Sequence, residues 1–499
     1  MKLKSFLAKP YAYAVQKKIR RNMANAVEDQ SAILQQLLKN GKLTLFGKDH
    51  HMEDVKEYEE FRQAIPVRDY EGIRHYIDQI KSGTENVLWR GKPMYFAKTS
   101  GTTSGVKYIP ISKDSISNHI DTAKYALLNY MAETGRPEFA DGKMIFLSGS
   151  PTLERVGGIP TGRLSGIVNH FVPGYLRRNQ MPSFETNCIE DWETKLHKIV
   201  TETSKQDMRL ISGIPPWMQM YFDWLSEANE GKKIKELFPN LQVIVHGGVN
   251  FQPYRAKLME SLGGNVDTIE TFPASEGFFA FQDSQKDEGL LLNTNSGIFF
   301  EFIPAAEIFS ENPRRLTLKD VQLGENYALI VNSNAGLWGY NIGDTVKFLS
   351  LDPYRIVVTG RIKHFISAFG EHVIAEEVEY AMRIAAEKHG AHIIEFTVAP
   401  MIQTTDGSLP YHEWLVSFEQ APDDLTAFAT TLDETLRQKN VYYDDLLRGA
   451  ILQTLKVTPM HPHAFIEYMK SIGKLGGQNK VPRLSNDRVI ADAMAPFKA

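Results

Sequence analysis

The stretch that decides how this chain can be interpreted is residues 98–111, KTSGTTSGVKYIPI. It combines small hydroxyl side chains with Gly101 and Gly105, and the lysines Lys98 and Lys107 flank this polar part. Such small polar side chains cannot fill a core, and the glycines let the backbone present consecutive N–H groups. N–H groups, hydroxyls and an ammonium that converge form a site for phosphate oxygens. From this stretch alone, an ordinary polar turn remains an equal alternative.

Length and composition limit the classes of protein to consider. A chain of 499 residues exceeds the roughly 250–300 residues that one core supports, so we expect two or three domains. Its 56 basic and 60 acidic residues leave a net charge of −4, which provides no general field for nucleic acid. The single cysteine, Cys188, excludes an internal disulfide and a cysteine-based zinc cluster. It is more typical of a buried apolar residue than of a nucleophile.

The N-terminus carries no recognisable export signal. Its basic start is followed by Tyr11 to Lys18, which interrupts the apolar run before it reaches signal-peptide length. No run of 18 apolar residues occurs, so we expect no membrane span. These features predict a cytoplasmic protein, which we expect to be a monomer that does not bind nucleic acid and has no membrane span.

The order of helices and strands predicts an α/β fold. Residues 1 to about 90 have apolar positions at helical spacing, and short apolar runs that end in small residues follow at 143–148, 209–213 and 241–248. Helical stretches such as 192–200 separate these runs. Strands that alternate with helices indicate a largely parallel sheet covered on both faces, with ligand sites at the carboxyl ends of its strands.

The pattern changes after residue 290. Closely spaced β-type runs at 297–303, 326–331 and 345–348 suggest an antiparallel or barrel-like module. A strand at 354–358 and a new α+β pattern from residue 374 follow. We therefore expect an N-terminal domain of residues 1–360, with mixed and parallel sheets and the barrel-like module, and a smaller α+β domain of residues 361–499.

Four further segments supply groups suited to a nucleotide. They are 270-ETFPASEGF-278, 339-GYNIGD-344, 359-TGRIK-363 and 476-GGQNKVPR-483. Together with residues 98–107, their order and spacing resemble the GH3 family of acyl-acid amido synthetases (auxin-responsive GH3-like), a branch of the adenylate-forming superfamily, in its bacterial type. The resemblance covers nearly the whole chain. Each motif alone is a weak signal, and five in order are a strong one.

The resemblance implies a two-step ligase. ATP and Mg²⁺ would adenylate a small carboxylic acid with release of pyrophosphate, and an amino acid amine would then take the acyl group. The family's phosphate-binding loop corresponds to Ser100, Gly101, Thr102, Thr103, Ser104, Gly105 and Lys107. The C-terminal domain would be a mobile lid.

The resemblance also implies roles for single residues. Phe272 would flank the adenine and Glu276 would hold Mg²⁺, which prefers carboxylate oxygens. Asp344 would accept hydrogen bonds from the ribose. Lys480 would reach the α-phosphate and the carboxylate during adenylation, so Lys480 and Glu276 are the expected catalytic residues. Ser275, Tyr340 and Arg361 would make further contacts with the nucleotide. Lys363 would be the hinge of the lid.

Two positions depart from the family pattern. Phe272-Pro273 stands where a tyrosine and a small residue are usual, which removes a phenol and keeps a stacking face. Asn341 stands where arginine is usual, which removes a cation near the nucleotide.

The residues that would bind the acyl substrate are less clearly indicated by the sequence. The candidates are Arg163, Trp217, His246, Gly247, Gly248 and Phe278. Arg163 could pair with a carboxylate, and His246 could orient the substrate. The aromatic candidates are equally consistent with a hydrophobic core, and a histidine at a strand end is more often structural.

Other classes of function fit the sequence less well. A P-loop NTPase requires glycine, four residues and then Gly-Lys-Ser/Thr, and Gly105-Val106-Lys107 does not match. His50-His51 and His461-Pro462-His463 lack the helical spacing and the acid partner of a zinc site. Transfer to coenzyme A and a non-catalytic nucleotide-binding module remain open alternatives.

Overall fold

A computed structural model describes residues 3–100, 106–172, 174–248, 251–310, 312–362, 365–366, 373–402, 404, 408–448, 451–475 and 480–499. The chain forms two compact units. The N-terminal unit contains residues 1–249 and 261–358, and the C-terminal unit contains residues 250–260 and 359–499. Over the described part of the chain, no helix is long and apolar enough to span a membrane.

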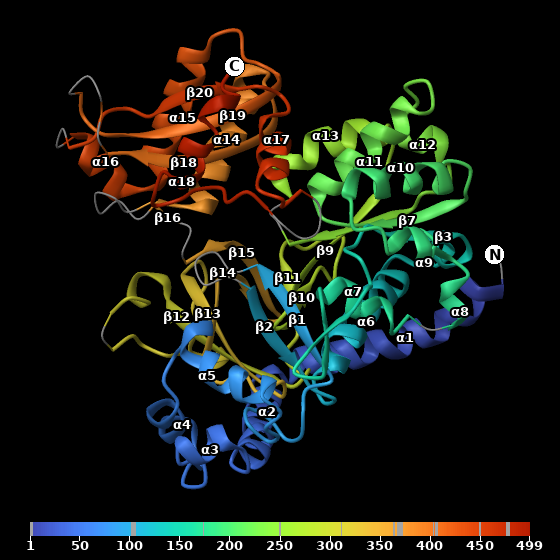
Figure 1. Ribbon diagram of the computed structural model, residues 1–499, viewed down its shortest axis with the longest axis vertical. Coiled ribbons are helices and arrows are strands. Elements are labelled where there is room, and N and C mark those ends of the chain that lie inside the picture. The colour runs from blue at the N-terminus through green and yellow to red at the C-terminus, as the bar shows by residue number, and fades with distance from the viewer. Residues whose placement is uncertain are drawn as a thin grey trace. The chain divides into compact units, whose positions relative to one another are not determined.

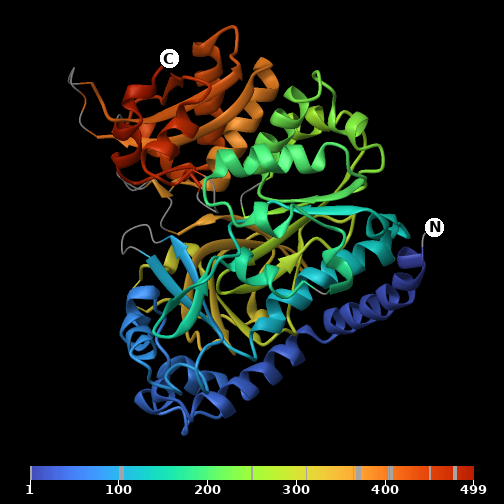
Figure 2. The ribbon, with the colours of Figure 1, turned by 45° about the vertical axis from the view of Figure 1, so that its right-hand side comes forward.

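Five helices precede the first strand, as the helical spacing predicted. They are α1 (Leu3–Ala24), α2 (Ala26–Gly41), α3 (Leu45–Asp49), α4 (Tyr58–Ala64) and α5 (Tyr70–Lys81). The apolar positions of α2, such as Ile33 and Leu37, lie in the core. Asp69 caps α5 by accepting hydrogen bonds from the N–H groups of Glu71 and Gly72. In Figure 2 the dark blue α1 runs alongside α6 (Ile116–Thr134), which follows the first strands.

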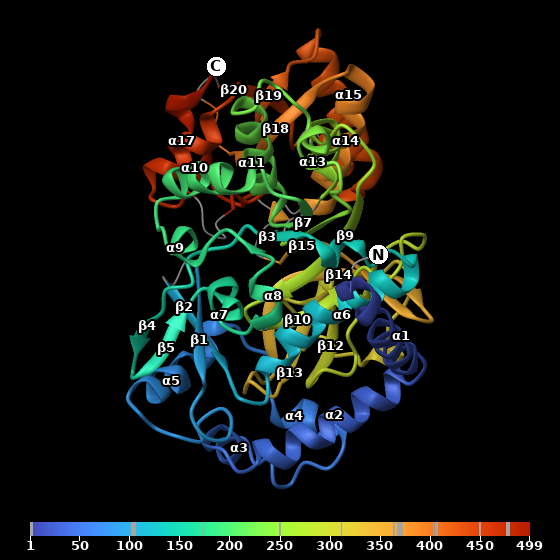
Figure 3. The same cartoon turned by 90° about the vertical axis from the view of Figure 1, so that its right-hand side faces the viewer.

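A small sheet carries the polar stretch. Its strands are β1 (Tyr95–Ser100), β2 (Val106–Ile111), β4 (Glu154–Val156) and β5 (Ile159–Gly162), in the order β2-β1-β5-β4. β1 and β2 form an antiparallel hairpin whose last pair is Ser100 and Val106, and β5 is parallel to β1. Figure 3 shows these four strands side by side. Residues 101–105, between β1 and β2, lie outside the described residues.

The strands predicted at 143–148, 209–213 and 241–248 form a parallel sheet. They are β3 (Lys143–Phe146), β7 (Met208–Ser212) and β8 (Val243–Gly247), flanked by β6 (Gln180–Met181) and β9 (Asp267–Ala274). All four neighbouring pairs are parallel. The intervening helices are α6 (Ile116–Thr134), α7 (Leu164–Asn169), α8 (Gly174–Arg177), α9 (Phe184–Asn187), α10 (Trp192–Thr203), α11 (Pro215–Glu227), α12 (Ile234–Leu237) and α13 (Gln252–Leu262).

The β-type runs after residue 290 are antiparallel, as expected, and they continue the same sheet. They are β11 (Leu290–Leu292), β12 (Ile298–Pro304), β13 (Asn326–Ser333), β14 (Tyr340–Leu351) and β15 (Tyr354–Arg361), and the preceding antiparallel strand β10 (Gly277–Phe281) connects them to β9. Among the described residues the sheet has eleven strands in the order β12-β13-β14-β15-β11-β10-β9-β8-β7-β3-β6. The large N-terminal sheet domain of the predicted α/β fold is confirmed.

A buried ionic cluster ties the early helices to this sheet. Glu301 on β12 is fully buried and pairs with Arg315 through two hydrogen bonds of 2.9 and 2.7 Å. Tyr58 and Asn332 also donate to the Glu301 carboxylate. Each charge is thus compensated, which matters because removing one partner of a buried pair costs about 3–5 kcal/mol.

The C-terminal unit has its own sheet and core (Figure 1). Its elements are β16 (Phe365–Ile366), β17 (Val373–Ile374), α14 (Ala375–His389), β18 (His392–Met401), β19 (Tyr411–Gln420), α15 (Leu425–Lys439), α16 (Val441–Arg448), β20 (Lys456–Met460), α17 (Ala464–Ser471) and α18 (Val489–Ala493). Arg483 is its main buried cation and pairs with Glu379 and Glu395. Tyr254 of α13 accepts a hydrogen bond from Arg483 and donates one to Glu395. The smaller α+β part of the predicted fold is also confirmed.

Candidate active site

The lysine that follows the polar stretch lies against an aromatic ring. The Lys107 Nζ is 5.8 Å from the centroid of the Tyr70 ring, a cation–π arrangement. Tyr70 is buried, and its hydroxyl accepts a hydrogen bond of 3.0 Å from the Tyr108 N–H. At the other end, Lys98 pairs with Glu154 at 2.9 Å. The described ends of the β1–β2 hairpin are therefore anchored on both sides.

The structure brings Glu276 and Tyr340 together. Ser275 and Glu276 form the two-residue turn between β9 and β10, since Ala274 pairs directly with Gly277. The Tyr340 hydroxyl, at the start of β14, is hydrogen-bonded to the Glu276 carboxylate. Burial raises the pKa of Tyr340 well above its ordinary value, and the charges of Glu276 and Asp69 raise it further. Tyr340 therefore stays protonated and acts as a donor to Glu276.

Backbone bonds hold Tyr340 in place. The Arg68 N–H donates to the Gly339 carbonyl at 2.9 Å, and the Asn341 N–H donates to the Arg68 carbonyl at 2.8 Å. This bridge places the start of α5, with Asp69 and Tyr70, beside Tyr340. Glu276, Tyr340, Tyr70 and Lys107 therefore belong to one neighbourhood of the N-terminal unit.

These groups fit a magnesium nucleotide chemically. Glu276 is partly exposed, and the neutral Tyr340 hydroxyl orients its carboxylate. An oriented carboxylate oxygen is the type of ligand that Mg²⁺ prefers. Lys107 adds a cation on the side of the polar hairpin, where phosphate oxygens would need one.

The other predicted nucleotide residues of this unit are more buried. Phe272 is 6% exposed and packs edge to face on Phe279, with ring centroids 5.2 Å apart. Asp344 is 7% exposed and follows Gly343, whose φ is 87°. The pairing of β13 with β14 is irregular at this point. Asn341 accepts the Gly343 N–H through its side chain, so this residue stabilises the turn before Asp344.

Near the carboxyl end of β8, two titratable side chains on the neighbouring strands β8 and β9 lie next to each other. His246 pairs in register with Glu270 on parallel neighbouring strands, so both side chains point to the same face of the sheet. Burial lowers the pKa of His246 to about 3 and raises the pKa of Glu270 to about 7. Gly247 must be glycine, because a Cβ there would lie 2.1 Å from the Thr271 carbonyl oxygen. Gly248 has a φ of 79°.

The other residues predicted to line the acyl pocket, Trp217, Phe278 and Arg163, differ in their surroundings. Trp217 on α11 is 5% exposed and packs on Trp192 with ring centroids 4.5 Å apart, which is a core contact. Phe278 on β10 is buried, and Asn118 of α6 binds both its N–H and its carbonyl. Arg163 follows β5 and is partly buried, and burial lowers its pKa.

Three predicted residues belong to the C-terminal unit. Arg361 ends β15 and is exposed, and Lys480 is exposed as well. Lys363, the predicted hinge, lies outside the described residues, as do Gly101, Thr102, Thr103, Ser104 and Gly105. The backbone of Ser100 is described as the end of β1.

Several buried polar residues were missed from the sequence. Lys195 is 2% exposed on the apolar face of α10, where its spacing from Trp192 and Ile199 could have identified it. His119 on α6 is also buried, and burial lowers its pKa to about 4. Glu270 lies on the same strand face as Phe272, and only the pairing with β8 reveals its neighbour His246.

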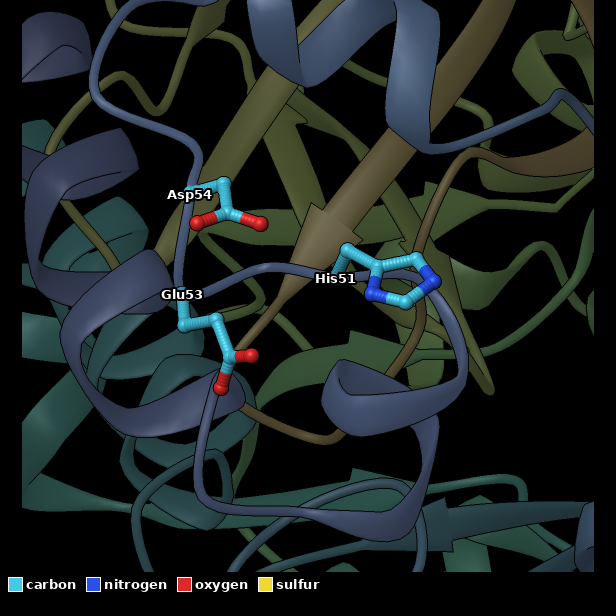
Figure 4. A group of neighbouring side chains, drawn as sticks. All are labelled: His51, Glu53 and Asp54. Atoms are coloured by element: carbon cyan, nitrogen blue, oxygen red, sulfur yellow. The ribbon is translucent and has the colours of Figure 1, made fainter.

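His51 has acidic neighbours that were not expected from the sequence. His50 contacts Arg68 and the Phe46 carbonyl. His51, Glu53 and Asp54 bring ligand atoms within 4.8 Å of one another, so acid partners are present that the sequence analysis did not expect (Figure 4). All three side chains are exposed, and exposed charged groups of this kind are ordinarily solvated.

Comparison with known proteins identifies three domains in order. The chain matches the GH3 family N-terminal domain over residues 15–175, the GH3 family central domain over residues 291–361 and the GH3 family C-terminal domain over residues 376–489. Among curated relatives, indole-3-acetic acid-amido synthetase GH3.15 of Arabidopsis thaliana is 22% identical and covers 93% of this chain and 92% of its own length. Indole-3-acetic acid-amido synthetase GH3.3 of the same plant is 25% identical, with coverage of 94% and 92%.

Solved structures agree in fold. The GH3.15 acyl acid amido synthetase superposes with a TM-score of 0.80 at 16% identity, over 97% of this chain and 96% of its own. A 2-hydroxyisobutyryl-CoA ligase in the postadenylation state superposes with a TM-score of 0.54 at 13% identity, over 97% and 91% of the two chains. The fold is therefore that of the adenylate-forming enzymes. Since the three family domains occur in order and span most of its length, the chain belongs to the GH3 family.

Proposed function

We propose that this protein is an ATP-dependent acyl-acid amido synthetase. It adenylates a carboxylic acid and transfers the acyl group to the amine of an amino acid. The observation that carries the proposal is the cluster of Glu276, Tyr340, Tyr70 and Lys107 next to the polar hairpin. The full-length relatives named as amido synthetases support the same chemistry.

In the first half-reaction the protein has to position the two substrates, and no proton has to be transferred. A carboxylate oxygen of the acid attacks the α-phosphorus of ATP, the bond to the bridging oxygen breaks, and pyrophosphate leaves. The protein has to align the reactants and offset negative charge. In our proposal Lys107 and the hairpin hold the phosphates, Phe272 and Asp344 hold the nucleoside, and Lys480 offsets charge at the α-phosphate.

The second half-reaction forms the amide. The amine nitrogen attacks the acyl carbon, and the bond from that carbon to the AMP oxygen breaks. The acceptor ammonium must lose one proton before it attacks, and the nitrogen loses a second as the amide forms. In our proposal residues 361–499 act as a lid that hinges at Lys363, so that Lys480 serves the first step and moves away for the second.

Glu276 is the residue that would hold Mg²⁺, with Tyr340 as its orienting partner. Bound there, the ion would neutralise charge on the phosphates. Mg²⁺, monomeric action and a cytoplasmic location are parts of the proposal that follow from the family chemistry and from the sequence.

Pyrophosphate exchange tests the proposal directly. We expect ATP to exchange with labelled pyrophosphate only when a suitable carboxylic acid from a broad panel is present. Mass spectrometry after addition of the twenty amino acids should then detect an amide. A thioester found only with coenzyme A would replace the second step, and the absence of exchange with every acid would exclude adenylation.

Lys480→Ala separates catalysis from nucleotide binding. Because the lysine is expected to offset charge only as the α-phosphorus reacts, exchange should fall by about 10²–10³-fold, while the Kd for ATP stays nearly constant. Exchange rate and ATP binding by calorimetry measure the two effects. Lys388→Ala, at an exposed lysine of the same unit, is the matched control. Equal losses of exchange and ATP affinity would contradict the assigned role.

Tyr340→Phe tests the orientation of Glu276. Loss of the hydroxyl should raise the Mg²⁺ concentration for half-maximal exchange by about 10–100-fold, as for other partners of metal ligands. Tyr327→Phe is the control, since Tyr327 is also buried and its hydroxyl donates to Glu325 at 2.8 Å. An unchanged Mg²⁺ requirement in Tyr340→Phe would contradict the role of Tyr340 in orienting a metal ligand.

A further inference from the structure

Arg163 lies close to the polar hairpin by strand register. β5 is parallel to β1, with Thr161 opposite Phe96 and Gly162 opposite Ala97. Arg163 follows directly, so it lies at the level of Lys98, near the end of β1. Because neighbouring strands are about 4.8 Å apart, Arg163 stands beside the segment that leads into the polar stretch.

The Arg163 side chain reaches from the small sheet to the large one. An ideal Cβ on Gly149 would come within 2.9 Å of the Arg163 Cδ, so the arginine stem passes directly over this glycine. Gly149 lies three residues after the end of β3. The side chain therefore points along the edge where the parallel strands β3, β7 and β8 have their carboxyl ends, which is where ligands bind in such sheets.

The charge of Arg163 is not compensated by a direct partner. In the described part of the chain its guanidinium forms no hydrogen bond and no ion pair, although burial lowers its pKa. A guanidinium offers five N–H donors, and leaving such a group partly buried without an acceptor is unfavourable. The nearest carboxylate that acts on it is Glu190, which is exposed.

A second cation supports the same loop. Lys195 of α10 is buried, and its ammonium donates to the carbonyls of Ser148 and Asn187 at 2.8 Å each. Ser148 directly precedes Gly149. Burial lowers the pKa of Lys195 to about 8; Cys188 and Glu190 oppose this shift and Arg163 adds to it. The two positive groups thus act on each other, and the exposed carboxylate of Glu190 acts on both.

The two substrates of the proposed reaction each carry a carboxylate, and only one of these keeps its charge through the reaction. The acid that is adenylated loses its carboxylate charge when it attacks phosphorus, so cations bound to it would hold the reactant more tightly than the product. An amino acid acceptor keeps its α-carboxylate through the whole reaction. A fixed arginine is suited to such a permanent carboxylate, because its planar fork binds both oxygens.

We propose that Arg163, with Lys195 as the supporting charge, binds the α-carboxylate of the acceptor amino acid at the carboxyl end of β3. This inference rests on the proposed function and names the class of acceptor. The site selects α-amino acids against amines that lack a carboxylate. Coenzyme A has no carboxylate, so it is not the class of acceptor that this site would select.

Arg163→Gln tests this assignment, because the arginine makes no hydrogen bond in the described structure that the fold would lose. The probes are a carboxylic acid that supports exchange, the amino acid that wild type conjugates best, and the α-carboxamide of that amino acid. We expect pyrophosphate exchange to stay within about twofold of wild type. The KM for the amino acid should rise by about 10–100-fold, and the KM for the carboxamide should not change.

Conservative and control variants sharpen the result. Arg163→Lys should restore part of the preference for the free carboxylate. Arg155→Gln, at an exposed arginine of the same small sheet that binds the Gly158 carbonyl at 2.7 Å, should leave the KM of every substrate unchanged.

Other outcomes would overturn the inference. A raised KM for the carboxylic acid in exchange would assign Arg163 to the acyl substrate, and a raised KM for ATP would assign it to phosphate. An unchanged preference for the amino acid over its carboxamide would leave the arginine without a binding role. If wild type conjugates amino acids but Arg163→Gln leaves the preference for the free carboxylate unchanged, only this inference fails. If wild type shows exchange but conjugates no amino acid, the transfer step of the proposed function fails together with this inference. If wild type shows no exchange, the proposed function fails as well.

Discussion

The hydrogen bond from Tyr340 to Glu276 is the interaction on which the candidate site depends. It joins the start of β14 to the turn between β9 and β10, and the backbone bridge through Arg68 extends it to the first turn of α5. Burial prevents Tyr340 from ionising, so its hydroxyl can only donate to the carboxylate. As a result, an acid at a two-residue turn, which would otherwise be loosely held, has a fixed position next to Tyr340, in the same neighbourhood as Tyr70 and the lysine that contacts it.

The distribution of positive charge follows the steps of the proposed reaction. Lys107 lies on β2 of the hairpin in the N-terminal unit, while Lys480 belongs to the C-terminal unit and is exposed. Arg163 and Lys195 form a third positive site, built from β5 and α10. Phosphate binding, adenylation and acceptor binding would thus rely on separate cations, so that each can be changed without removing the others.

Much of the fold could be predicted from the sequence, because the relevant signals are local. The strands β3, β7 and β8 appeared as short apolar runs, and the helix at 192–200 had a clear apolar face. The family assignment from five ordered motifs is confirmed, and the relatives carry the amido synthetase activity that the resemblance implied. The antiparallel strands continue the parallel sheet through β9 and β10. This could not be predicted, because no local sequence pattern indicates which strands are neighbours.

The site could be predicted as a set of motifs but not as an arrangement. The contact of Lys107 with Tyr70, the register of His246 with Glu270 and the position of Lys195 under Ser148 depend on pairing between distant segments. Residues 250–260 show the same limit, because Tyr254 joins the core of the C-terminal unit although its neighbours in sequence belong to the other unit.

The central claim is that the acid reacts through an acyl adenylate, and oxygen transfer measures this most directly. A carboxylic acid labelled with ¹⁸O at both carboxylate oxygens is incubated with ATP, Mg²⁺ and the acceptor, and the products are analysed by mass spectrometry. The account predicts one ¹⁸O in the phosphate of AMP and one in the amide carbonyl. AMP without label, or label in inorganic phosphate or pyrophosphate, would contradict it.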